Sequence, residues 1–187
     1  MAKNFKILLF LIILALILIS VSFAIYFFNF RILEETKAPI AEVKEIVSGV
    51  YQITKVIDGD TMEVKIKDKQ ELVRLIGINT PEVDSPYTKE ECFGPEASAY
   101  AKKLLDTKEV YLIPDSNGQD RDKYNRLLRY VFLPNGLFIN AEILKNGFAY
   151  NYIYEPFEFM KQFDFWEKEA KGNKIGLWDK CVSTIIK

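Results

Sequence analysis

Histidine is absent from the 187 residues of this chain. Its absence excludes the commonest general base, the serine–histidine and cysteine–histidine catalytic pairs, and histidine metal ligands. Any hydrolytic chemistry must therefore use carboxylates, arginines and a hard cation.

Cysteine is scarce, because Cys92 and Cys181 are the only two. Two cysteines are too few for a four-cysteine zinc site, and they lie too far apart for a C-x-x-C redox motif. We expect a disulfide that joins the loop before the first helix of the domain to the C-terminal tail. Two separate free thiols are the alternative.

The chain also lacks an excess of positive charge. It has 25 basic and 26 acidic residues, and without Lys3 and Lys6, the only charged residues before residue 31, 23 basic residues face 26 acidic ones, a formal charge of −3. Proteins that bind nucleic acid usually carry a basic footprint. Recognition of phosphate must therefore come from a local basic patch.

Charge is missing altogether from residues 7–28. About 20 apolar residues suffice for a helix to cross the hydrocarbon core of a membrane. We therefore expect a membrane anchor within residues 1–30, followed by a stalk over residues 31–48. The alternative is a cleaved signal peptide, for which Ser22-Phe23-Ala24 offers small residues at a suitable spacing.

The charges that flank this apolar segment indicate its orientation. Lys3 and Lys6 precede it without an acidic residue, whereas basic and acidic residues are mixed after it. The lysine-marked end is expected to remain cytoplasmic. The sequence thus predicts a single-pass cell-membrane protein with an extracellular domain, or a secreted one if the segment is cleaved, and this location permits a disulfide.

Alternation of apolar and polar residues after residue 49 predicts five half-buried strands. They cover Val50–Ile57, Met62–Ile66, Leu72–Ile78, Val110–Ile113 and Leu127–Leu133, and Lys67-Asp68-Lys69 supplies a turn. Helices are expected from Gly94-Pro95, from about Asn140 to Gly147, and over Phe157–Lys171.

This order of elements predicts a small α+β domain over residues 49–181, with a tail over residues 182–187. A five-stranded barrel covered by helices is the natural closure for so few short strands. Periodicity alone does not distinguish this barrel from another α+β fold.

Polar clusters adjoin three of the predicted strands, at residues 58–61, 74–82 and 122–126. Each cluster taken singly fits a hairpin turn or a helix cap. Arg74 is harder to explain in this way, because an arginine within an apolar strand must find an anion or a carboxylate. The polar stretch Asp115–Arg126 is too hydrophilic for the core and is a candidate functional loop.

The segments VIDGDT (56–61), RLIGINTPE (74–82), GPEA (94–97) and DKYNR (122–126) together resemble the ordered motifs of the staphylococcal nuclease family. The resemblance extends from about Tyr51 to Trp178 and includes IGLW (175–178) near its end. It implies an OB-like barrel with three helices, here preceded by the transmembrane helix. It also implies calcium-dependent hydrolysis of phosphodiester bonds in DNA and RNA, and it points to no protein partner.

The resemblance also implies a metal site. Asp60 and Asn79 would bind calcium through side-chain oxygens and Thr80 through its backbone carbonyl, while Asp58 would support the site without binding the ion. Oxygen atoms are the ligands that calcium prefers.

The catalytic roles implied by the resemblance fall on Arg74, Glu82 and Arg126. Glu82 would act as the general base on the attacking water, and the two arginines would hold the phosphate. A guanidinium can bind two phosphate oxygens at once, which a lysine cannot match.

The substrate-binding roles implied by the resemblance fall on four other residues. Lys123 and Tyr124 would lie beside the phosphate, and Tyr152 and Tyr154 would flank the nucleotide. Residues two apart on an extended stretch share one face, where they could stack on a base. The alternative for these last two residues is that they are ordinary core tyrosines.

Asn79 departs from the family pattern, because the founding nuclease has an aspartate there. Since calcium affinity follows ligand charge, we expect weak binding, with a dissociation constant on the order of 10⁻⁴ to 10⁻³ M. Asn79 could instead mark a lost metal site, or Asp58 could replace the missing charge.

A non-catalytic OB-fold module that binds nucleic acid or protein is the alternative function. Loss of the catalytic glutamate or arginines would indicate such a module. Because Arg74, Glu82 and Arg126 are all present, the sequence favours the enzyme.

Overall fold

The computed structural model describes residues 16–26, 49–84, 86, 89–116 and 118–181. The chain divides into two units, Met1–Ile46 and Val47–Lys187. In the first unit, residues 16–26 form a helix whose apolar side chains are exposed. No helix within the described residues is both long and apolar enough to span a membrane. The expected span over residues 7–28 lies partly outside these residues, and the expected stalk (31–48) and tail (182–187) lie entirely outside them.

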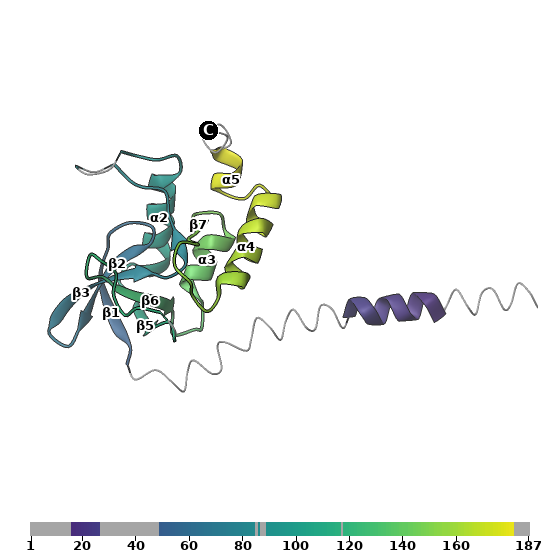
Figure 1. The fold of residues 1–187 in the computed structure, drawn as a ribbon, viewed down its shortest axis with the longest axis horizontal. Coiled ribbons are helices and arrows are strands. Elements are labelled where there is room, and N and C mark those ends of the chain that lie inside the picture. The colour runs from purple at the N-terminus through teal and green to yellow at the C-terminus, as the bar shows by residue number, and fades with distance from the viewer. Residues whose placement is uncertain (1–15, 27–48, 85, 87–88, 117, 182–187) are drawn as a thin grey trace, which may run out of the picture. The chain divides into compact units, whose positions relative to one another are not determined.

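The second unit is built on a closed barrel of five strands (Figure 1). They are β1 (Tyr51–Val56), β2 (Thr61–Ile66), β3 (Lys69–Leu75), β5 (Glu109–Ile113) and β6 (Leu127–Phe132), in the order β1-β2-β3-β6-β5. Neighbouring strands are antiparallel except for β3 and β6, which run parallel. The expected five-stranded barrel is confirmed.

The expected strand Leu72–Ile78 is wrong at both ends. Lys69, predicted to lie in a turn, already belongs to β3, and this strand ends at Leu75. A turn at Gly77, with φ of 76°, then leads the chain out of the barrel. Ile78–Asn79 form the separate strand β4, which pairs with β7 (Tyr150–Asn151).

The three expected helices are present as α2 (Gly94–Leu105), α3 (Ile139–Lys145) and α4 (Met160–Gly172). A short helix that the sequence did not predict, α5 (Leu177–Lys180), follows them. α2 packs on β1 and α3, and α3 packs on β6 and α4, so that the helices gather at one side of the barrel (Figure 1).

Asn140 joins these layers at a buried position. Its side-chain oxygen accepts a hydrogen bond from Val131 N at 2.9 Å, and its amide nitrogen donates to Ile76 O at 2.9 Å. Because buried polar groups need such partners, Asn140 fixes the chain where it leaves β3. The segment that follows carries Asn79 and Glu82.

The structure contains the expected disulfide between Cys92 and Cys181, with Cα atoms 5.9 Å apart. Leu177 and Trp178 of α5 are buried around it and form a second, smaller apolar core. Phe93 and Tyr150 pack against this core. The disulfide therefore ties the C-terminal segment to the loop before α2.

Candidate active site

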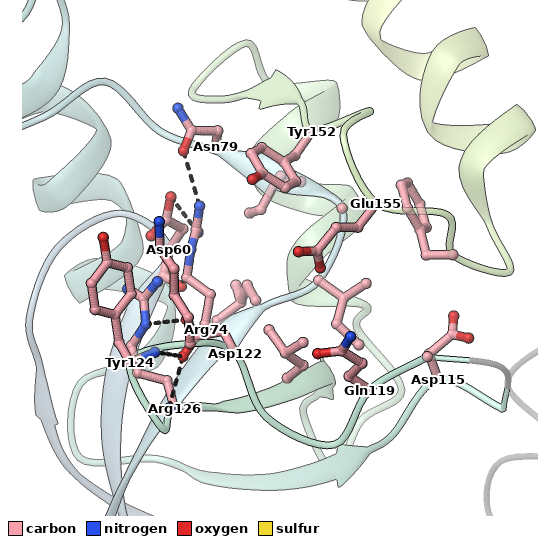
Figure 2. A pocket seen from close by; sticks show the side chains of 18 of the residues that line it. Asp60, Arg74, Asn79, Asp115, Gln119, Asp122, Tyr124, Arg126, Tyr152 and Glu155 are labelled. Carbon is pink, nitrogen blue, oxygen red and sulfur yellow. Dashed lines mark hydrogen bonds and ion pairs between the residues drawn. The ribbon is translucent and has the colours of Figure 1, made fainter.

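A cavity of about 620 Å³ is lined by residues from the turn before β2, the end of β3, the polar loop before β6 and the segment after β7 (Figure 2). Eight of the ten residues assigned catalytic, substrate or metal roles from the sequence line it: Asp60, Arg74, Asn79, Glu82, Lys123, Tyr124, Arg126 and Tyr152. Thr80 and Tyr154 do not belong to its lining. The fold thus gathers residues that are up to 92 positions apart in the chain.

The hairpin between β1 and β2 presents Asp60. Asp58 Oδ1 accepts a hydrogen bond from Asp60 N at 3.0 Å, which holds the turn. A Cβ at Gly59 would lie 2.6 Å from Thr80 Oγ1, so glycine is required for the hairpin to approach the segment after β4. Asp58 therefore shapes the turn that places Asp60, in keeping with a supporting role.

Asp60 is a nearly buried carboxylate with several partners. Its Oδ2 accepts hydrogen bonds from Thr80 N at 2.8 Å and Thr80 Oγ1 at 3.2 Å, and it forms an ion pair with Arg74. Its Oδ1 accepts a hydrogen bond from Thr61 Oγ1 at 3.1 Å. These bonds fix the carboxylate in a single orientation at the end of the cavity.

Arg74 lies on β3 directly opposite Thr61 on β2, and its side chain is only 13% exposed. Besides its ion pair with Asp60, it donates from Nη2 to Asn79 Oδ1 at 3.0 Å (Figure 2). The expectation that an arginine in this strand must find a carboxylate is confirmed.

Arg126 is held at the end of the polar loop by Asp122. Arg126 Nε donates to Asp122 Oδ2 at 2.7 Å, and Asp122 Oδ1 accepts from the backbone N of Tyr124 and of Arg126, each at 2.9 Å. Burial raises the pKa of Asp122, but these hydrogen bonds and the Arg126 charge outweigh it and hold the pKa below its usual value. Asp122 therefore stays ionised and orients the guanidinium.

Thr61 connects the two arginines. Arg126 Nη1 donates to Thr61 Oγ1 at 3.3 Å, and the same hydroxyl donates to Asp60 Oδ1. Arg126, Thr61, Asp60 and Arg74 thus form one continuous set of polar contacts that ends at Asn79. Two guanidiniums on one rigid set of bonds can bind a phosphate between them.

Negative charge is concentrated at this end of the cavity. Burial and the nearby Asp60 carboxylate raise the pKa of Asp58 to about 6. Burial, followed by the charges of Asp60 and Glu91, also raises the pKa of Glu82. The positive charge of Arg74 lowers both pKa values, but it offsets only part of the increase.

The residues expected to bind calcium supply oxygen donors of three kinds: a carboxylate from Asp60, an amide from Asn79 and a backbone carbonyl from Thr80. These donors suit calcium, which accepts all three. Across the described part of the chain, no group of three or more His, Cys, Asp or Glu side chains is arranged to hold a metal ion. This donor set contains only one carboxylate. In addition, Asp60 Oδ2 and Asn79 Oδ1 both contact Arg74. The donor set therefore fits a site that binds calcium weakly.

Tyr124 and Tyr152 line the cavity, and Tyr154 contacts Tyr152 from outside the lining. Tyr124 is 67% exposed, and its ring centroid lies 5.0 Å from Lys123 Nζ and 5.4 Å from the Arg126 guanidinium carbon. The rings of Tyr152 and Tyr154 are 5.2 Å apart and meet edge to face. Because Tyr154 is 82% exposed and Tyr152 is partly exposed, the alternative that they are core tyrosines is wrong.

Several residues of the site were not assigned roles from the sequence. Thr61 and Asp122 belong to the motifs at 56–61 and 122–126. Membership of these motifs was the only feature of the sequence that could have indicated a role for them. Gln119 and Glu155 point into the far part of the cavity (Figure 2). Gln119 belongs to the loop singled out for its polarity, whereas nothing in the sequence around Glu155 marked it.

Comparison with known proteins agrees with this arrangement. The family described as staphylococcal nuclease homologue matches residues 72–180. Thermonuclease of Staphylococcus hyicus is 36% identical over 129 residues, covering 68% of this chain and 75% of its own. Endonuclease YncB of Bacillus subtilis is 37% identical over 130 residues, covering 68% of this chain and 61% of its own. An uncharacterized protein of Methanocaldococcus jannaschii is 35% identical over 149 residues, covering 68% of this chain and 70% of its own. The chain therefore belongs to the staphylococcal nuclease homologue family.

Proposed function

We propose that this chain is a calcium-dependent nuclease that hydrolyses phosphodiester bonds of DNA, RNA or both at the outer surface of the cell. The family and the relatives named as nucleases support a nuclease function in general. The observation that carries the proposal is that Arg74, Glu82 and Arg126 line one cavity together with Asp60 and Asn79.

In this proposal Arg74 and Arg126 bind the phosphate of the scissile bond. Each is partly neutralised and oriented by a carboxylate, Asp60 for Arg74 and Asp122 for Arg126. Donors that are already oriented cost little reorganisation when charge develops on phosphate oxygens in the transition state. Removal of one such donor typically costs about 10²- to 10³-fold in rate.

Glu82 is proposed as the general base. It lines the cavity, and its side chain is exposed to solvent. As the oxygen of a water molecule bonds to phosphorus and the bond to the leaving oxygen breaks, Glu82 accepts the proton of the water. The leaving oxygen takes a proton from solvent, and Glu82 releases the proton that it accepted to solvent before the next turnover.

Calcium would be held by Asp60, Asn79 and the Thr80 carbonyl, and it would polarise the phosphate and help to position it. Single-stranded nucleic acid is the proposed substrate. Lys123 and Tyr124 would contact its phosphate, and Tyr152 and Tyr154 would stack on a base without reading sequence. This local patch meets the need for basic and aromatic groups in a domain of net negative charge.

The location is part of the proposal. We infer an anchor in residues 1–30 that crosses the membrane over residues 7–28, a stalk over 31–48, the nuclease domain over 49–181 and a tail over 182–187. The exposed apolar side chains of the helix at residues 16–26 support a membrane environment for it. The disulfide supports an oxidising compartment for the domain.

Incubation of the purified full chain with single-stranded DNA or RNA, with calcium or with a chelator, tests the proposal. We expect cleavage in calcium only. Glu82→Gln and Arg126→Ala should remain folded and lower turnover by about 10²-fold or more. Glu90→Gln is the matched control, because Glu90 lies on the same segment but does not line the cavity.

Near wild-type turnover in Glu82→Gln or Arg126→Ala would show that the assigned roles are wrong. Binding of nucleic acid without cleavage by the unmodified chain in calcium would favour the alternative function, a non-catalytic OB-fold module. Arg126→Lys adds a finer measurement, since it keeps the charge but loses the two-pronged geometry.

A further inference from the structure

We infer that Glu91 is a positioning residue for Glu82, held in place by the disulfide-closed C-terminal core. This inference rests on the proposed function of Glu82 as the general base. Glu91 lies nine residues after Glu82 and does not line the cavity, so it acts through the segment that carries Glu82 and not on the substrate.

Both backbone polar groups of Glu82 bond to Glu91. Glu82 N donates to Glu91 Oε2 at 3.1 Å, and Glu91 N donates to Glu82 O at 2.9 Å. Glu82 itself lies outside any helix or strand. Its backbone therefore depends on these two bonds for an alignment that a strand or helix would otherwise provide.

The start of α2 buttresses the same bonds. Gly94 N donates to Glu91 O at 3.0 Å, and a Cβ at Gly94 would lie only 2.1 Å from Glu82 O. Only glycine allows the helix to begin so close to the Glu82 carbonyl. Ala97 and Ala101 on α2 are fully buried, so Glu91 is linked to the rigid part of the barrel.

The disulfide fixes the residues directly after Glu91. Cys92 is bonded to Cys181 at the end of α5, and the Phe93 ring stacks on Phe148 with centroids 5.3 Å apart. Leu177, which begins α5, is fully buried. A side chain as mobile as glutamate can hold a backbone N–H only if its own backbone is held, and this core supplies that restraint.

The same core also supports the strand of Asn79. Trp178 meets the Tyr150 ring edge to face at 5.3 Å, and Tyr150 pairs with Asn79 across β4 and β7. One apolar core, closed covalently, thus stands behind both the segment of the proposed base and the strand of a proposed metal ligand.

Loss of the Glu91 carboxylate should release the Glu82 backbone N–H to solvent and let the Glu82 side chain sample more orientations. Alignment of reacting groups contributes to the chemical step. Glu91 contacts neither Arg74 nor Arg126, the residues proposed to bind the phosphate, so kcat should fall while KM stays the same.

The test measures kcat and KM of the full chain in calcium with single-stranded DNA, below the unfolding midpoint of each variant. We expect Glu91→Ala to lower kcat by about three- to tenfold, as for the loss of one hydrogen bond, with KM within about twofold. Glu91→Gln should retain kcat at a pH where Glu82 is fully ionised, because its amide oxygen can still accept from Glu82 N, although loss of the Glu91 charge lowers the pKa of Glu82. Glu91→Asp, which keeps the charge but is one methylene shorter, should fall like Glu91→Ala. Glu90→Ala is the matched control and should match the unmodified chain.

Comparison with Glu82→Gln distinguishes failure of the proposed role of Glu82 from failure of the positioning role of Glu91. If Glu82→Gln keeps full turnover, the proposed role of Glu82 fails. If Glu82→Gln is inactive but Glu91→Ala keeps full kcat, only the positioning inference is overturned. A Glu91→Gln variant as slow as Glu91→Ala would also overturn it, because charge and not the hydrogen bond would then matter. The double variant Glu82→Gln/Glu91→Ala should be no slower than Glu82→Gln, since Glu91 acts only through Glu82, and additive losses would contradict this.

Discussion

The side-chain oxygen of Asn79 would have two partners, Arg74 and the proposed calcium ion. It accepts a hydrogen bond from Arg74 at 3.0 Å, and in the proposed function it also binds calcium. An amide carries no formal charge, so it can satisfy both groups only weakly. The hydrogen bond from Arg74 to the same oxygen is therefore a second reason to expect low calcium affinity.

Asn79→Asp should tighten calcium binding without abolishing cleavage. The change restores a carboxylate at the same chain length and nearly the same shape, and calcium affinity follows ligand charge. We expect the calcium concentration that gives half-maximal activity to fall by about five- to tenfold. Calcium titration of cleavage in both forms checks this, and an equal half-saturation point would mean that residue 79 is not a ligand.

Thr61→Val should weaken the connection between the two arginines. Valine matches the shape of threonine but cannot accept from Arg126 Nη1 or donate to Asp60 Oδ1, the two bonds made by Oγ1. We expect kcat to fall by about three- to tenfold, which corresponds to loss of the one bond that aligns Arg126.

Thr61→Ser retains the hydroxyl and is the control for this variant, with urea unfolding of both to measure stability. Equal kcat values for the serine, valine and unmodified forms would show that the Thr61 hydroxyl contributes nothing to the alignment of Arg126.

At the scale of elements, the C-terminal helix depends on the rest of the domain. α5 has only four residues, too few to be stable alone. Its buried side chains and the bond from Cys181 to Cys92, 89 positions apart, hold it in place. The short strands β4 and β7, of two residues each, likewise exist because the surrounding core brings them together.

Removal of the disulfide, by reduction or in the double variant Cys92→Ala/Cys181→Ala, should lower the free energy of unfolding by about 4 kcal/mol in the chain-entropy model. A cross-link over so many residues removes much of the entropy of the unfolded chain. Urea unfolding with and without reductant measures the change. Reductant should not affect the double variant, and an unchanged midpoint in the unmodified chain would contradict the prediction.

For the whole molecule, the composition of the two units implies different environments. The first unit contains the uncharged run of residues 7–28, whereas the second unit, Val47–Lys187, has 20 basic and 22 acidic residues and a net charge of −2. An uncharged apolar run is stable in lipid, and a charged domain with a solvent-open cavity is stable in water. This difference is the physical basis of the proposed anchor.

The full chain should remain with the membrane fraction after alkaline carbonate extraction, and a chain lacking residues 1–30 should be released. About 20 apolar residues bind a bilayer too strongly for carbonate to extract them. N-terminal sequencing of the product made in cells provides the second measurement. A mature protein that begins just after Ala24 and appears in the medium would establish the cleaved signal peptide and refute the anchor.

The sequence by itself determined the local features of this protein. Alternating residues predicted the five strands, and Gly94-Pro95 predicted the start of α2. Four ordered motifs predicted the family and roles for seven of the residues that line the cavity. These features could be predicted because they depend on local periodicity, turn chemistry and motif spacing. The partner of Arg74 could also be anticipated in kind, since a buried guanidinium needs a carboxylate.

Only the tertiary structure decided which residues contact one another across the chain. Thr61 joins Arg126 to Asp60 because β2 lies beside β3, and β3 lies beside β6. β4 pairs with β7, and Glu91 bonds to Glu82, although neither contact has a periodic signal in the sequence. Strand register and loop closure are set by packing of the whole core, so residues that are distant in sequence acquire a shared role only after the barrel has closed.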